Sequence, residues 1–182
     1  MTTSDIRDLV PVLETERLIL RGHTSSDCIH SAAMWADPEV VRLISGQTAT
    51  EAQSWGRILN YAGLWHHLGY GYWAVFERSS DAFLGEVGFA DFKRALVAPV
   101  SGVPEIGWAF RTAVQGQGFA IEAVRRIVAW ADQSLPHPET FCIVDPKHER
   151  SLSLATKVGY EVASTGKNAG KDVLIMSRPR RG

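Results

Sequence analysis

The chain has 182 residues, and 19 Lys and Arg against 20 Asp and Glu leave a formal net charge of −1. This balance excludes a global attraction to nucleic acid or to an anionic membrane, so we expect neither as a partner. With 45% hydrophobic and 21% charged residues, the composition is that of an ordinary globular protein. We expect one domain over residues 14–178, after a loosely held lead-in (1–13) and before a basic tail (179–182).

The two cysteines, Cys28 and Cys142, are too few for a disulfide framework. The N-terminal residues lack the apolar run of a secretory signal, so we expect a cytoplasmic protein. Cys142 lies in an apolar strand pattern, which favours a place in the core over a nucleophilic role. The six histidines show no spacing typical of a metal site, and we predict no bound metal.

The first half of the chain gives strand and helix signals in turn. Alternation predicts a strand from Arg17 to Arg21. N-cap residues at 25–27 predict a helix to about Trp35, and Thr50 begins a longer helix. Two strands, 69–76 and 83–92, then form an antiparallel pair, and residues 105–110 form the next strand.

The most informative segment is the loop Gln115–Ala120 and the helix after it. Gly116 and Gly118 permit positive φ and close approach, and the apolar positions from Ala120 to Ala131 have helical spacing. Free backbone N–H groups of such a loop and helix start can hold a phosphate. The pattern therefore predicts a pyrophosphate-binding turn.

The last quarter of the chain contains a strand at 141–144 and a short helix at 151–158, which Gly159 ends. Strand signals at 160–162 and 172–177 bracket a loop from Ser164 to Lys171 and predict a closing hairpin.

Two known loop patterns compete for the glycine turn. The dinucleotide fingerprint G-x-G-x-x-G/A accounts for Gly116 and Gly118, and Asp145 follows the next strand, but its third small residue would be Ile121. The pattern Q/R-x-x-G-x-G/A is complete in Gln115, Gly118 and Ala120 and resembles the acetyl-CoA loop of the GNAT N-acetyltransferase superfamily. The element order, with an antiparallel meander before the turn, also favours GNAT.

The resemblance to GNAT extends along residues 14 to 178 and points to its RimJ/RimL-like branch. It rests on four more segments, in the family's order: Glu14–Arg21 (ETERLILR), Glu105–Trp108 (EIGW), Asp145–Ser151 (DPKHERS) and Lys157–Tyr160 (KVGY). It implies the GNAT acyl-CoA N-acyltransferase fold, an α/β (α+β) arrangement with a mixed, mostly antiparallel sheet of six to seven strands flanked by helices. It also implies direct transfer of an acetyl group from acetyl-CoA to an amine.

Resemblance assigns a set of residues to acetyl-CoA. These are Trp108, Ala109 and Phe110, where a backbone N–H would polarise the thioester carbonyl; Gln115, Gly116, Gln117, Gly118, Phe119 and Ala120, which would hold the pyrophosphate; and His148 and Ser151. Ser151 stands where the branch places a serine near the sulfur, although it is equally suited to cap its helix. His148 replaces the usual Asn, which puts that contact in doubt.

Glu105 is our candidate base, with Glu86 in reserve, because a carboxyl in apolar surroundings can have its pKa raised toward neutrality. Glu105 could instead be the partner of an arginine. The acceptor, a peptide N-terminus or a small-molecule amine, is expected near an aromatic set comprising Trp35, Trp55, Trp65, His66, Tyr70 and Tyr72, with Trp55 itself in the core. The alternatives are a CoA-binding sensor without activity and, less favoured, a nicotinamide-binding oxidoreductase. A monomer or a homodimer fits the sequence.

Overall fold

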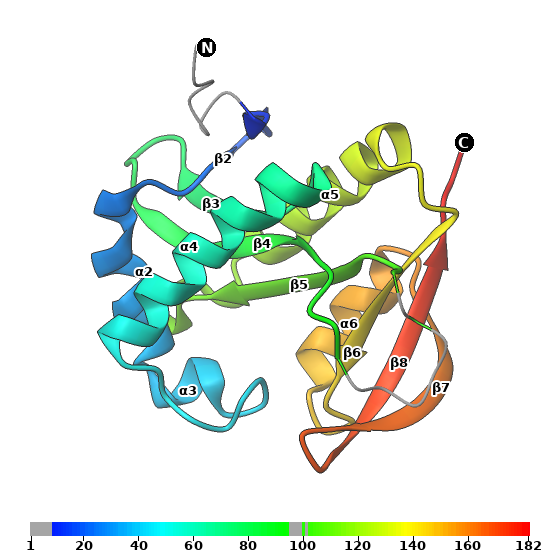
Figure 1. Ribbon diagram of the computed structural model, residues 1–182. Helices are drawn as coiled ribbons and strands as arrows, with labels where there is room; N and C mark the ends of the chain where they lie inside the picture. Colours follow the sequence, from blue (N-terminus) through cyan, green and yellow to red (C-terminus); the bar gives the residue numbers. More distant parts are fainter. Residues whose placement is uncertain (1–8, 95–99, 101) are drawn as a thin grey trace.

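A computed structural model describes residues 9–94, 100 and 102–182, and in these its strands form one eight-stranded sheet (Figure 1). The spatial order is β1-β2-β3-β4-β5-β6-β8-β7. The strands are β1 (Leu13–Glu14), β2 (Leu18–Arg21), β3 (Tyr72–Glu77), β4 (Phe83–Ala90), β5 (Glu105–Phe110), β6 (Glu139–Val144), β7 (Glu161–Asn168) and β8 (Lys171–Pro179). Residues 1–8 of the expected lead-in lie outside the described residues.

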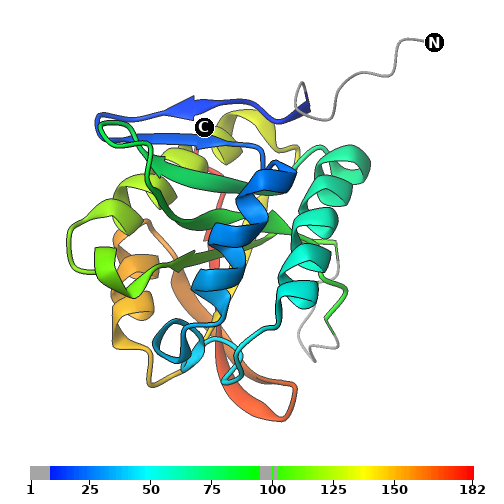
Figure 2. The same cartoon turned by 90° about the vertical axis from the view of Figure 1, so that its left-hand side faces the viewer.

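Helices cover both faces of the sheet. They are η1 (Ser25–Asp27), α2 (Cys28–Trp35), α3 (Pro38–Val41), α4 (Glu51–Leu68), η2 (Thr112–Val114), α5 (Phe119–Ser134) and α6 (Glu149–Lys157). Figure 2 shows α2 and α4 on one side of the central strands and α5 on the other. Among the described helices, none is both long enough and apolar enough to cross a lipid bilayer.

The sheet is mixed and mostly antiparallel, as the resemblance predicts. Among the described strands, only β5 and β6 pair in parallel, and α5 is the crossover between them. This order differs from the parallel series of a doubly wound dinucleotide fold. The sheet has one strand more than the predicted six to seven, because Leu13 and Glu14 pair with Ile19 and Leu20 at its edge.

Strand β4 is buried along its whole length because helices cover both of its faces. Val87 and Phe89 belong to the core cluster under α5, whereas Glu86 is directed to the α2 and α4 side. Helix α4 begins with the expected Thr50 cap, in a capping box with Gln53, and ends at Gly69 with φ of 73°.

Two local predictions are wrong. Residues Ser164–Asn168 are strand, not loop, because the hairpin closes in a two-residue turn at Ala169 and Gly170, whose φ values of 49° and 80° suit the twist of a hairpin. Trp55 is 40% exposed rather than in the core. The buried stripe of α4 runs through Ser54, Ile58, Tyr61 and Trp65, one position away from Trp55.

Candidate active site

The turn before α5 presents a row of backbone N–H groups. Gly116 and Gly118 have φ of 79° and 82°, and Gly118 is the N-cap of the helix. The first backbone bond of the helix runs from the N–H of Glu122 to the carbonyl of Gly118. Within the described chain, no acceptor is found for the N–H groups from Gly116 to Ala120. These groups are free to bind an anion.

Charged side chains hold this turn in place. Arg17 donates to the carbonyl of Gln117 and forms an ion pair with Glu122 at 2.7 Å. The side chain of Gln115 donates to the carbonyl of Phe110 at 3.4 Å and accepts from Arg150 at 2.8 Å. Two guanidinium groups therefore hold the turn, and the charge of Arg17 is paired with that of Glu122.

Strands β5 and β6 diverge in front of this turn. They share a single register pair, Glu105 with Phe141, and Figure 1 shows them separating beyond it. The N–H of Arg111 donates to the carbonyl of Leu84 in β4. By alternation, the N–H groups of Trp108 and Phe110 are directed away from β4, toward the opening, whereas that of Ala109 is directed toward β4. Trp108 and Phe110 can thus offer main-chain donors between the strands.

Ser151 meets Trp108 at the opening, and His148 caps the helix that carries Ser151. Helix α6 begins at Glu149, and its N-cap is His148, whose Nδ1 accepts the N–H of Ser151 at 3.3 Å. The alternative that Ser151 caps the helix is therefore wrong. Its hydroxyl instead accepts a hydrogen bond from Nε1 of Trp108 at 3.3 Å. Burial lowers the pKa of His148, which favours the neutral imidazole that the cap requires.

Glu105 lies at the start of β5 in an open pocket of about 230 Å³, whose lining includes Asp91, Phe92 and Arg94. Its carboxylate accepts a hydrogen bond from Nε of Arg94 at 2.7 Å, as expected if Glu105 is the partner of an arginine. The side chain of Glu105 is 7% exposed. Burial raises the pKa of Glu105 and Asp91 adds to the rise, while Arg94 opposes it, and the net shift is upward. A carboxyl with these properties can accept a proton from a group in the pocket.

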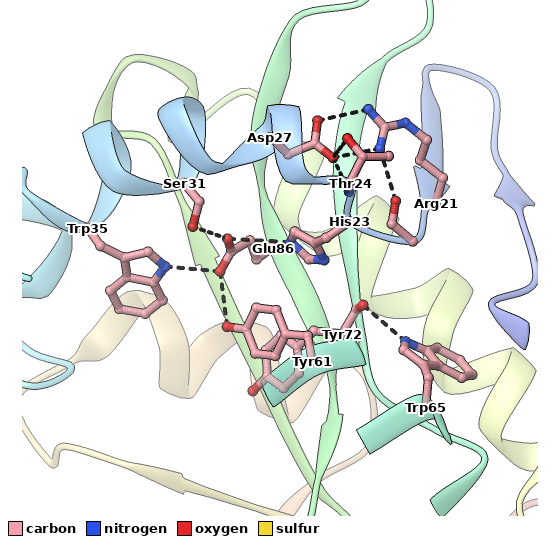
Figure 3. A network of polar contacts seen from close by, with 11 residues as sticks. Arg21, His23, Thr24, Asp27, Ser31, Trp35, Tyr61, Trp65, Tyr72 and Glu86 are labelled. Atoms are coloured by element: carbon pink, nitrogen blue, oxygen red, sulfur yellow. Dashed lines mark hydrogen bonds and ion pairs between the residues drawn. The ribbon is translucent and has the colours of Figure 1, made fainter. Parts of the chain in front are cut away.

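Glu86 is fully buried between the sheet and helices α2 and α4 (Figure 3). Its carboxylate accepts hydrogen bonds from the Ser31 hydroxyl at 2.6 Å, Trp35 Nε1 at 2.9 Å and the Tyr61 hydroxyl at 3.0 Å. Nε2 of His23 lies 3.4 Å away, a looser contact. Burial alone would raise the pKa of Glu86, but His23 and the hydrogen bonds from Ser31 and Trp35 outweigh it, and the net shift is downward.

The aromatic residues proposed for acceptor recognition separate into four environments. Trp35 binds Glu86, as described above. Trp65 packs edge-on against Trp73 in the core, and Tyr70 belongs to the same core cluster. His66 is exposed on α4. Tyr72 alone extends along the sheet toward Glu105, under the ring of Tyr61.

The two cysteines lie in different surroundings. Cys142 is buried in β6, and burial, together with nearby Glu105, raises the pKa of its thiol well above the usual range. Cys28 stands at the first position of α2. In residues 9–94, 100 and 102–182, no three His, Cys, Asp or Glu side chains gather in a way that would hold a metal ion.

Comparison with known proteins agrees with this geometry. Residues 17–161 match the profile of the acetyltransferase (GNAT) domain. The uncharacterized N-acetyltransferase YoaA of Bacillus subtilis (strain 168) is 26% identical over 154 residues, which are 84% of each chain.

Two solved structures share the fold. A Bordetella pertussis protein described as a GnaT-family acetyltransferase is 27% identical, with a TM-score of 0.82 over 92% of this chain and 99% of its own. Ribosomal-protein-S5-alanine acetyltransferase from Vibrio fischeri is 18% identical, with a TM-score of 0.76 over 93% and 97%. At this identity the second structure shows a shared fold.

Proposed function

Because the chain belongs to the GNAT acetyltransferase family, and so transfers acetyl groups from acetyl-CoA to an amine, we propose that its acceptor is a primary amine that attacks the thioester directly. The amine is a protein N-terminus or a small molecule. The name of the Vibrio fischeri enzyme, which specifies an alanine of a ribosomal protein, supports including proteins among the acceptors.

The observation that carries the proposal is the row of free amides from Gly116 to Ala120 beside the opening between β5 and β6. These amides would hold the pyrophosphate of acetyl-CoA. The N–H of Trp108 or Phe110 would polarise the thioester carbonyl, because both are directed into the opening. Ser151, already within reach of Trp108, would lie near the leaving sulfur and donate to it.

Glu105 would remove the proton from the attacking ammonium, directly or through water. Its carboxylate borders an open pocket and its pKa is raised, both of which suit a general base. Glu86 suits the role less well. It is inaccessible, its oxygens already accept three hydrogen bonds, and its pKa is lowered.

An acceptor panel tests the proposal. The purified protein is mixed with acetyl-CoA and N-terminal peptides, including those of ribosomal proteins, or small primary amines, and free thiol is measured. We expect release of CoA that depends on one class of amine and is accompanied by an N-acetyl product. Acetyl-CoA binding without turnover of any amine would support the sensor alternative instead.

Direct attack predicts that no acetyl-enzyme forms. Intact mass spectrometry after exposure to acetyl-CoA without acceptor should show the unmodified chain. An acetyl adduct on Cys28 or Cys142, lost together with activity on replacement by Ala, would show a two-step mechanism.

A further inference from the structure

Tyr72, Gly88 and Gly107 form one row across β3, β4 and β5. Tyr72 is in register with Gly88, and Gly88 is in register with Gly107. The tyrosine ring lies over both glycines: a Cβ on Gly88 would be 2.6 Å from Cγ of Tyr72, and a Cβ on Gly107 would be 2.1 Å from its hydroxyl oxygen. A glycine inside a strand often marks close approach by another group. Here two glycines on neighbouring strands leave room for a single phenol.

The row places the phenol hydroxyl on the face of β5 that carries Glu105. Glu105 and Gly107 are two residues apart in β5, so their side-chain positions are on the same face of the sheet. The ring of Tyr72 also packs with Ala90 and Phe92, which line the pocket of Glu105. The hydroxyl over Gly107 therefore lies, along β5, between the candidate base and the N–H groups of Trp108 and Phe110.

Nearby residues fix the ring in this position. Tyr61 stacks on Tyr72 with the ring centres 4.5 Å apart and the planes 7° from parallel. The hydroxyl of Tyr61 is in turn held by the buried carboxylate of Glu86 (Figure 3). Phenylalanine would fill the same space as Tyr72 without the hydroxyl. Among the described residues, the buried polar atoms left without a partner do not include the Tyr72 hydroxyl, and the Tyr61 hydroxyl donates to Glu86.

Resting on the proposed function, we infer that the Tyr72 hydroxyl contacts the acceptor nitrogen beside Glu105, and that Tyr61 and Glu86 are positioning residues for the ring. The hydroxyl oxygen accepts a hydrogen bond from an N–H of the amine and holds the nitrogen between Glu105 and the thioester. Burial, with a further contribution from Glu105, raises the pKa of Tyr72 far above its usual range, so the phenol stays neutral. It orients the amine, while Glu105 takes the proton.

A derivative of CoA tests this inference without the acceptor having to be known, because the probe itself carries a nitrogen in the place of the acceptor nitrogen. In it, the sulfur of CoA is extended by CH₂–CO–NH–CH₃, so that an amide N–H stands where the attacking amine would be. The ratio of the Kd of CoA to that of the probe is measured by calorimetry for the wild type, Tyr72→Phe and Tyr70→Phe. Tyr70 is a matched control because it is a buried tyrosine of the opposite core cluster.

We expect the wild type and Tyr70→Phe to bind the probe more tightly than CoA. In Tyr72→Phe the ratio of the Kd of CoA to that of the probe should be roughly fivefold smaller, which corresponds to the loss of one hydrogen bond. The Kd of CoA and the Tm should stay unchanged in Tyr72→Phe, because the ring is kept. An equal ratio in Tyr72→Phe and the wild type, or a wild type that binds the probe no better than CoA, would overturn the inference. Wild-type protein that binds neither CoA nor acetyl-CoA would instead refute the proposed function.

Discussion

The two faces of the β4–β5 strand pair present different chemistry. On the α5 side, the groups available to a ligand are main-chain amides of the turn 116–120, and the strand residues there, such as Val87 and Ile106, are apolar core. On the α2 and α4 side, the same strands carry Glu86 and Glu105, which meet Tyr61 and Tyr72. The first face suits a ligand that every family member shares, because any sequence has amides. The second face depends on particular side chains and suits the individual acceptor.

The largest effect is expected at the turn. In Gly118→Val, a β-branched side chain would have to adopt φ of 82°, and its Cβ would come within 3.3 Å of Arg17 Nη2. We expect at least a roughly 100-fold rise in the Kd of acetyl-CoA, as lost pyrophosphate contacts cost about 3 kcal/mol or more. Calorimetry measures it.

Gly170→Val is the matched control, since Gly170 has φ of 80° and open space around it but lies in the β7–β8 turn. Gly170→Val should have the same kind of backbone strain as Gly118→Val but keep the wild-type Kd of acetyl-CoA. Near-wild-type affinity in a folded Gly118→Val protein would remove the turn from the site.

Glu105→Gln should act on the other face. We expect kcat to fall about 100-fold, within the range for loss of a general base, with the Kd of acetyl-CoA unchanged. The pKa of Glu105 is raised, and its carboxylate form, the base, is present above that pKa. The wild-type rate should therefore rise with pH as Glu105 loses its proton. The pH profile of the variant should lack this rise.

The variant should regain rate at high pH, where free amine is abundant. Asp91→Asn is the control, because Asp91 lines the same pocket but its partner is Lys93. It should keep the rise of rate with pH, moved to lower pH because Asp91 no longer raises the pKa of Glu105. Wild-type kcat and an unshifted profile in Glu105→Gln would make Glu105 the structural partner of Arg94.

The smallest effect is expected at His148. It caps α6 with a neutral ring, and Asn is among the best N-cap residues. His148→Asn should keep the cap and change the Kd of acetyl-CoA by less than about threefold, whereas His148→Ala should cost about 1 kcal/mol of stability. Chemical denaturation and calorimetry on both variants measure this. A Kd that improves tenfold or more in His148→Asn would mean that the histidine impairs a direct contact with CoA.

The two faces also differ in how far the sequence predicts them. The turn and α5 follow from local pattern, because Gly116, Gly118 and the helical spacing lie within one short segment. The face on the α2 and α4 side depends on register between strands: Tyr72 meets Gly107 only because β3, β4 and β5 pair as they do. Arg94 as the partner of Glu105 had no sequence signal beyond its charge.

The beginning of α6 was misplaced for a different reason. Ser is a common N-cap and His is not, so propensity favoured a helix starting at Ser151. The ring nitrogen of His148 does the capping instead, and this leaves the serine hydroxyl to Trp108. The spacing from His148 to Ser151, an N-cap and its third helical residue, was the available signal.

A crystal structure of the complex with acetyl-CoA tests the division between the two faces most directly. The account predicts the pyrophosphate within hydrogen-bond distance, about 3 Å, of amides in the turn 116–120. It also predicts the thioester oxygen on the N–H of Trp108 or Phe110, with the acetyl carbon open to the side of Glu105 and Tyr72. A pyrophosphate bound away from the turn, or an acetyl group closed off from Glu105, would contradict it.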